Sequence, residues 1–314
     1  MNDEITFLPD EHYRFVDRRI RVRTNSEAAR DRLRLMYARF RSDGEADDAP
    51  ETLFQVVDRL ETDNLMEVRD DHREYRLAMT GRFPHFTCQS LATGEFESVG
   101  FCDPLVLVQS TLLDAVAVAS GRRAFLFHAG AVARGGKALL LSARSRMGKT
   151  TLVLNLLRRG CDFLSDEVAW LDPETGMVTP FPRKINMRRA GMDLLGLEPD
   201  ERHTLSGVGE DGPEFAVDAE DIPGVRIAEP ARAETLLFLK GFADQPILER
   251  VAPANAIFEF MNSAIGPLPD PGRALFEFAP VLDRLKCYNL ISGETEPTTD
   301  MVMELLETEP NGDD

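Results

Sequence analysis

The segment 143–150 has the residue types and the spacing of a phosphate-binding loop. It begins with alanine, continues through four residues and ends in Gly-Lys-Thr, which fits the relaxed pattern of such loops. In these loops backbone N–H groups surround the phosphates at a helix N-terminus, a lysine reaches the β and γ oxygens, and a hydroxyl binds Mg²⁺. Lys149 and Thr150 have the side chains for the last two roles. The sequence therefore predicts binding of ATP and Mg²⁺ by Ala143, Arg144, Ser145, Arg146, Met147, Gly148, Lys149, Thr150 and Thr151.

An acidic pair is expected to reach the same place. A helix over 149–159 rises about 15 Å at 1.5 Å per residue, and a strand over 161–166 returns about 16 Å at 3.3 Å per residue. Asp166 and Glu167 then lie level with the phosphates. A regular strand would point these two side chains to opposite faces, so either the strand bends there or only one of them meets the nucleotide.

A hairpin is expected to bring His128 to the mouth of the site. Residues 125–133 and 138–142 predict two apolar strands, and Gly135-Gly136 suits a two-residue turn between them. With this turn, the numbers of paired residues add up to 271, so His128 falls opposite Ala143. Taken singly, a histidine in an apolar strand is more often a core residue, and an acidic pair is more often a solvated turn. Their convergence on one loop favours a functional role for both.

These residues resemble the core of the HPr kinase/phosphorylase family, and more closely its HPr-kinase-related branch. The resemblance spans about 125–189 and rests on 127–133 (FHAGAVA), 143–150, 163–168 (FLSDEV), Asp172-Pro173 and 180–183 (PFPR). It implies an α/β fold with a P-loop kinase core and a mixed β-sheet, like that of HPr kinase and phosphoenolpyruvate carboxykinase. In such kinases the histidine before the loop and the acidic pair after it surround the transferred phosphoryl group.

Carried over to this chain, the resemblance implies a role for each of these residues. His128 would contact the phosphoryl group or orient the acid, and Asp166 would accept the proton of the acceptor hydroxyl. Glu167 would help Thr150 hold Mg²⁺. Independently of the resemblance, Arg183 and Lys184 lie in a proline-bounded loop of a basic region and are candidates for a phosphate clamp, with a solvated loop as the equally weighted alternative.

The chain also departs from the family pattern. The family loop usually has glycine at the positions of Ala143 and Arg146, and the acidic pair is Asp-Glu where the HPr enzymes proper have Asp-Asp. The second, glycine-containing signature of HPr enzymes has no match in the sequence. If position 146 needs a positive φ, arginine there costs on the order of 1 to 2 kcal/mol. These departures argue against HPr itself as the substrate and against phosphorylase activity.

Three functions follow as hypotheses. The first is an ATP-dependent kinase that transfers the γ-phosphoryl group to a hydroxyl, with a Ser of a protein or peptide as the expected acceptor. The second is a nucleotide-binding regulatory or adaptor protein with a degenerate kinase site, which Arg146 favours. The third is a small-molecule kinase, which differs from the first only in the acceptor. The sequence leaves open whether the chain forms a homo-oligomer.

Charge and cysteine content narrow the classes of partner and location. The 36 basic and 54 acidic residues give a formal net charge of −18, so we expect neither a nucleic-acid partner nor a membrane partner. Residues 137–189 hold ten basic and five acidic side chains, a local +5 that leaves −23 for the rest. The four cysteines are scattered without a CxxC pair, and the N-terminal Met-Asn-Asp-Glu is acidic where a secretory signal would be positive. These features favour a reducing, cytoplasmic location.

The sequence predicts two domains and a short tail. Residues 1–102 predict an α+β module with strands at 13–22, 53–60 and 64–79, a hairpin tip at Asp70-Asp71, a helix over 26–41 and a loop over 42–51. Residues 103–309 predict the kinase domain, which opens with a helix over 103–120. Its later part predicts strands near 235–240 and 248–251, a loop over 206–213 and a last helix over 298–307. Residues 310–314 predict a disordered tail.

Overall fold

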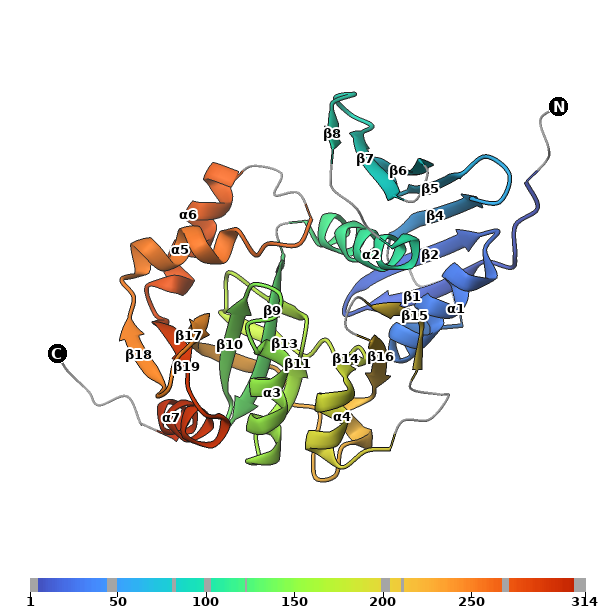
Figure 1. The fold of residues 1–314 in the computed structure, drawn as a ribbon. Helices are drawn as coiled ribbons and strands as arrows, with labels where there is room; N and C mark the ends of the chain where they lie inside the picture. Colours follow the sequence, from blue (N-terminus) through green and yellow to red (C-terminus); the bar gives the residue numbers. More distant parts are fainter. Residues whose placement is uncertain are drawn as a thin grey trace. The chain divides into compact units, whose positions relative to one another are not determined.

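The chain forms two compact units of mixed α/β structure, Met1–Gly121 and Arg122–Asp314 (Figure 1). The computed structural model describes residues 5–43, 50–80, 83–98, 103–121, 123–198, 204–209, 212–266 and 271–307. The predicted tail over 310–314 and most of the predicted loop over 42–51 lie outside these residues. The broad α/β class predicted from the sequence is confirmed. Within the described residues, no helix has both the length and the apolar character needed to cross a membrane.

The first unit is an eight-stranded sheet with two helices on one face. In spatial order its strands are β3 (Arg41–Ser42), β1 (Glu11–Phe15), β2 (Arg18–Thr24), β4 (Glu51–Arg59), β5 (Leu65–Arg69), β6 (Arg73–Thr80), β7 (Phe83–Ser90) and β8 (Phe96–Ser98). Neighbouring strands are antiparallel except β2 and β4, which are parallel and are connected through α1 (Glu27–Met36). Helices α1 and α2 (Pro104–Ser120) contact each other and both contact β2, so they cover the same face.

Two elements of this unit differ from the sequence prediction. The predicted strand over 13–22 is the β1–β2 hairpin, which turns at Val16 with a φ of 57°. The predicted helix over 26–41 ends at Met36 and is followed by the 3₁₀ turn η1 (Ala38–Phe40) and by β3. Beyond the helix, the ring centroid of Phe40 lies 4.9 Å from that of Phe15. The predicted hairpin tip at Asp70 is confirmed, since its carboxylate accepts hydrogen bonds from the backbone N–H groups of His72 and Arg73.

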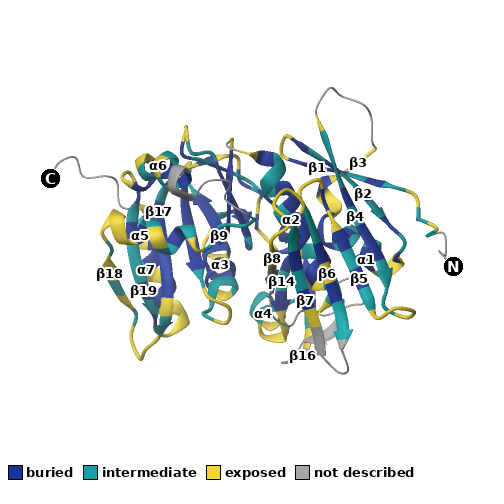
Figure 2. Cartoon of the chain, turned by 90° about the horizontal axis from the view of Figure 1, so that it is seen from above, coloured by how far each residue is buried: buried dark blue, intermediate teal, exposed yellow. Residues whose placement is uncertain are grey.

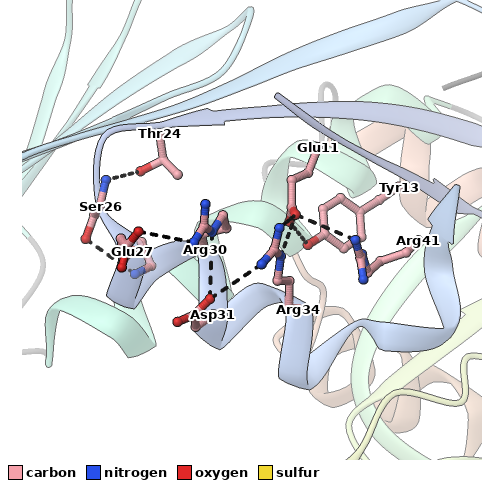
Figure 3. Close-up of polar contacts among 10 residues, drawn as sticks. Glu11, Tyr13, Thr24, Ser26, Glu27, Arg30, Asp31, Arg34 and Arg41 are labelled. Carbon is pink, nitrogen blue, oxygen red and sulfur yellow. Dashed lines mark hydrogen bonds and ion pairs between the residues drawn. The ribbon is translucent and has the colours of Figure 1, made fainter. Parts of the chain in front are cut away.

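A polar network fixes helix α1 to the first strand (Figure 3). Ser26 caps the helix, and its hydroxyl accepts a hydrogen bond from the N–H of Ala29. At the other end, the buried Glu11 carboxylate accepts from the Tyr13 hydroxyl at 2.9 Å and forms an ion pair with Arg34. The network therefore links the last turn of the helix to β1.

The boundary between the units lies after α2 instead of before it. The sequence predicts a boundary between residues 102 and 103, which would place this helix in the second domain. In the structure, the Tyr37 hydroxyl donates to the Gln109 carbonyl and the Tyr75 hydroxyl to the Asp114 carboxylate, each at 3.2 Å. The buried face of α2 packs against the sheet of the first unit, and the division falls at Gly121.

The second unit is built on a mixed sheet with helices on both faces. Its strands are β9 (Phe125–Arg134), β10 (Lys137–Ala143), β11 (Asp162–Ser165), β12 (Val168–Leu171), β13 (Met177–Thr179), β17 (Ala231–Phe242), β18 (Ile247–Arg250) and β19 (Lys286–Ser292). Strands β10, β17 and β19 run parallel to one another, and β9 is antiparallel to β10, β11 and β12. The parallel strands therefore end at the same edge of the sheet.

Two buried clusters cover the two faces of this sheet. Leu139 and Leu141 belong to the cluster that holds α3 (Lys149–Arg158), α4 (Arg189–Leu195) and α7 (Thr295–Glu307). Leu140 points to the other face, where α5 (Pro253–Met261) and α6 (Pro271–Leu282) supply Phe260 and Phe278. Strand residues alternate between faces, so one apolar run contributes to both clusters. Strands β9 and β17 are buried over most of their length (Figure 2).

A small sheet replaces a loop predicted from the sequence. The prediction of a loop over 206–213 is wrong for its described residues, because β15 (Thr204–Gly209) and β16 (Gly212–Val217) are strands. Strand β15 pairs with β16, and β16 pairs with β14 (Ile185–Arg188). The glycines favour a loop locally, but Phe215 and Val217 are buried in the core together with Ile185. Long-range pairing therefore decides the conformation of this segment. The short turn η2 (Ala219–Asp221) follows it.

Candidate functional site

A cavity of about 510 Å³ opens at the carboxyl ends of the parallel strands. The end of β10 leads into the 143–150 segment, and the ends of β17 and β19 contribute Phe242 and Ser292. In α/β sheets, ligands bind outside the carboxyl ends of the strands. Of the nine predicted nucleotide-binding residues, eight line the cavity, and Met147 packs against the buried core instead.

The 143–150 segment forms a tight turn that starts helix α3. Gly148 is the N-cap with a φ of 85°, and Lys149 is the first residue of the helix. Arg146 has a φ of 68°, so the position where the loops of the resembled family usually have glycine adopts the left-handed conformation. Such a conformation costs about 1–2 kcal/mol in a non-glycine residue. The backbone of the segment is thus strained at Arg146.

Gly130 allows the first turns of α3 to lie close to strand β9. A Cβ at this position would stand 2.8 Å from Val153 Cγ2 and 3.5 Å from Lys149 Cγ. Carbon atoms prefer separations of about 3.5–4.0 Å, so the first of these contacts would be a clash. The sequence motif contains this glycine, but the reason for it becomes visible only in the packing.

The predicted hairpin register is confirmed, and it positions His128. The pairs run from Lys137 with Arg134 to Ser142 with Ala129, all with the predicted sum of 271. On its other edge β9 pairs with β12, where His128 lies opposite Val168. Its imidazole lines the cavity.

The acidic pair lies where the returning strand is interrupted. β11 ends at Ser165 and β12 begins at Val168, and the Ser165 hydroxyl accepts the N–H of Val168 at 2.9 Å. The predicted alternative in which the strand bends is therefore the one observed. Asp166 and Glu167 occupy the break and both reach the residues predicted for the site.

The two carboxylates have different partners. Asp166 contacts the start of α3: its Oδ2 accepts from the Thr150 hydroxyl at 3.3 Å, and its carbonyl oxygen accepts from Lys149 Nζ at 2.8 Å. Glu167 lines the cavity, with Oε1 at 3.0 Å from His128 Nδ1 and Oε2 at 3.0 Å from the Arg183 guanidinium. Asp166 therefore faces the 143–150 segment, and Glu167 faces the histidine.

Burial and neighbouring charges shift the pKa values of the Asp166 and Glu167 carboxyl groups in opposite directions. Burial raises the pKa of the Asp166 carboxyl above its ordinary value, although the Lys149 charge opposes this shift. For Glu167 burial acts against ionisation, but the charges of Lys149 and Arg183 and the His128 hydrogen bond outweigh it and hold the pKa of that carboxyl well below its ordinary value. Glu167 is therefore ionised at neutral pH.

Arg183 lies in the protein interior next to Glu167. Its side chain is only 2% exposed and is not among the described residues that line the cavity. The neighbouring Lys184 pairs with Asp218 at 3.4 Å. The structure thus gives Arg183 a contact with the acidic pair, in place of the open loop position that the sequence suggested.

The residues at the start of α3 fit a nucleotide-bound Mg²⁺ ion. Mg²⁺ prefers oxygen ligands and commonly takes one or two protein ligands together with phosphate oxygens and water. Thr150 and Asp166 offer a hydroxyl and a carboxylate side by side, and the buried Asp166 Oδ1 has no hydrogen-bond partner among the described residues. Among all residues that the structure describes, no group of three or more His, Cys, Asp or Glu side chains is suited to hold a metal.

Some cavity residues were missed at the level of sequence. Phe242 and Ser292 follow the apolar runs of β17 and β19, so the rule for carboxyl ends of parallel strands could have found them. Asn186 and Glu214 come from the small sheet, which no local sequence pattern predicted. In comparisons with known proteins, no protein-family model matches this chain, and no curated protein has a significantly similar sequence.

Proposed function

We propose that the second unit is an ATP-dependent, Mg²⁺-requiring kinase of the HPr-kinase-related type, which transfers the γ-phosphoryl group to a Ser hydroxyl of a protein or peptide. The observation that carries this proposal is the contact of Asp166 with both Lys149 and Thr150 beside the cavity. A lysine, a hydroxyl and a carboxylate at a helix N-terminus are the groups that bind Mg²⁺-nucleotide phosphates.

The start of α3 supplies the phosphate site. Backbone N–H groups of the 143–150 segment and the Lys149 ammonium bind the phosphate oxygens, while Thr150 and Asp166 hold Mg²⁺. When bound, Mg²⁺ supplies positive charge against the phosphate oxygens. This assignment gives Asp166 the metal-binding role that the family resemblance gave to Glu167.

Glu167 is then the residue that binds and positions the acceptor hydroxyl. Its carboxylate lines the cavity, and the contacts with His128 and Arg183 fix its two oxygens. The acceptor oxygen attacks the γ phosphorus as the bond to the β–γ bridging oxygen breaks and ADP leaves. The proton of the acceptor hydroxyl passes to Glu167. In phosphoryl transfer such a carboxylate acts mainly by positioning the hydroxyl.

The test is phosphate transfer from γ-labelled ATP with Mg²⁺ in a lysate of the source cells. Lys149→Ala and Glu167→Gln should each lower the transfer rate by about a hundredfold or more. Lys137→Ala and Glu234→Gln are matched controls, because these two residues form a pair outside the cavity, 3.3 Å apart, and should keep the activity. Equal transfer by the wild type and the first two variants would refute the proposal.

The strained loop favours a second candidate function. Arg146 in a left-handed conformation is the observation that supports a nucleotide-binding regulator without transfer activity. Such a protein would be stabilised by ATP in a Lys149-dependent manner and would transfer no label. A small-molecule kinase would instead place the label in a dialysable product.

A further inference from the structure

An exposed aromatic ring stands at the edge of the cavity. Phe242 is the last residue of β17, its side chain is 65% exposed, and it lines the cavity. Its backbone is held in the sheet, since Phe242 pairs with Ser292 and the next N–H donates to the Ser292 carbonyl at 2.8 Å. The ring is thus carried by a fixed strand end, which suits a binding surface.

The ring lies beside the N-terminus of α3. A Cβ at Gly148 would stand 3.6 Å from Phe242 Cε1 and Cζ. Gly148 is the N-cap of the helix, and the Lys149 and Thr150 side chains follow it directly. The ring therefore lies close enough to be reached by a nucleotide whose phosphates bind the 143–150 segment.

Exposure alone does not distinguish Phe242. Phe258 on α5 is exposed to the same extent, at 66%, but it is not one of the described residues that line the cavity. Phe242 combines an uncovered apolar ring with a place next to the phosphate-binding segment. A planar base is the apolar part of a nucleotide, and every base has a π-face that can cover such a ring.

We propose that Phe242 stacks on the base of the bound nucleotide. The inference rests on the proposed function, because it needs the phosphates to bind at the start of α3. A ring face offers no hydrogen bonds to a base edge, so Phe242 supplies affinity for ATP and GTP alike. The group recognised is a nucleoside triphosphate, and the phosphate part is bound independently of the ring.

The experiment measures calorimetric binding of Mg²⁺-ATP, Mg²⁺-GTP and inorganic tripolyphosphate. Phe242→Ala should weaken binding of both nucleotides by about fivefold to a hundredfold and change tripolyphosphate binding by less than about twofold. Phe242→Tyr should keep the affinity of the wild type, because it retains the ring. Phe258→Ala is the matched control with an equally exposed ring and should behave as the wild type. Thermal unfolding of each variant confirms that it is folded.

Other outcomes separate this inference from the proposed function. The stacking role is refuted, while the phosphate site stands, if Phe242→Ala binds ATP as tightly as the wild type does. It is also refuted if the substitution weakens tripolyphosphate binding as much as ATP binding. If the wild type binds tripolyphosphate and ATP equally tightly, the base contributes nothing and the inference also fails. If the wild type binds none of the three ligands, the nucleotide site itself is wrong. Lys149→Ala should weaken all three ligands together.

Discussion

Gly130 links the packing of the second unit to its candidate site, and its replacement by alanine is a quantitative test. The added Cβ would stand 2.8 Å from Val153 Cγ2, closer than the about 3.5 Å at which carbon contacts become favourable. Overpacking of this kind typically costs about 1–3 kcal/mol. Alanine also restricts the unfolded chain, which offsets about 0.4–1 kcal/mol of that cost. We expect Gly130→Ala to destabilise the second unit.

A double-mutant cycle isolates the clash. Val153→Ala removes the Cγ2 atom, and we expect it to cost about 1.6 kcal/mol for two buried methyl groups together with a cavity term. In the double variant the added Cβ has no Cγ2 to meet, so only the restriction of the unfolded chain remains, and the double variant should be more stable than Val153→Ala alone by about 0.4–1 kcal/mol. The coupling free energy should therefore equal the cost of the clash, about 1–3 kcal/mol in favour of the double variant.

The assay is urea unfolding followed by tryptophan fluorescence. Trp170 is the single tryptophan of the chain and lies in the second unit, where it stacks 6.2 Å from the Phe181 ring. The signal therefore reports on this unit alone. Each kcal/mol corresponds to about 2–4 °C in melting temperature for a unit of this size. Additive effects within about 0.5 kcal/mol would refute the packing argument.

Three further predictions concern other parts of the chain. Burial raises the pKa of the Asp70 carboxyl, so the wild type loses stability as the pH rises from the unfolded-state pKa of this group to its folded-state pKa. Asp70→Asn should therefore be more stable than the wild type at pH 7, and this gain should disappear at about pH 4 and below. Urea unfolding of both proteins at the two pH values measures the difference. Burial raises the pKa of the Cys161 and Cys287 thiols to about 11, so iodoacetamide at neutral pH should modify them only in the unfolded chain; mass spectrometry of native and denatured samples checks this, and rapid native labelling would contradict it. Ser26→Ala removes the cap of α1 and should cost about 1 kcal/mol, seen as faster hydrogen exchange in that helix, whereas unchanged exchange would show that the cap contributes nothing.

Local patterns were sufficient where neighbouring residues decide the conformation. The Gly135-Gly136 turn predicted the β9–β10 register correctly, and Asp70 predicted its hairpin tip. The lengths predicted for the helix and for the strand that follows it correctly brought Asp166 back to Lys149, because rise per residue is a property of the backbone. The same reasoning failed for 206–213, where pairing with a distant strand outweighs the loop preference of the glycines.

The sequence by itself determined the chemistry available at the candidate site: a lysine, a hydroxyl, two carboxylates and a histidine, at spacings that bring them to one strand end. Only the tertiary structure decided how these groups are divided, with Asp166 on Thr150 and Glu167 on His128 and Arg183. It also decided that Phe242 stands beside Gly148. The physical reason is that spacing fixes how far the chain travels along an element, while side-chain contacts depend on strands and helices that are distant in sequence and are aligned only by packing.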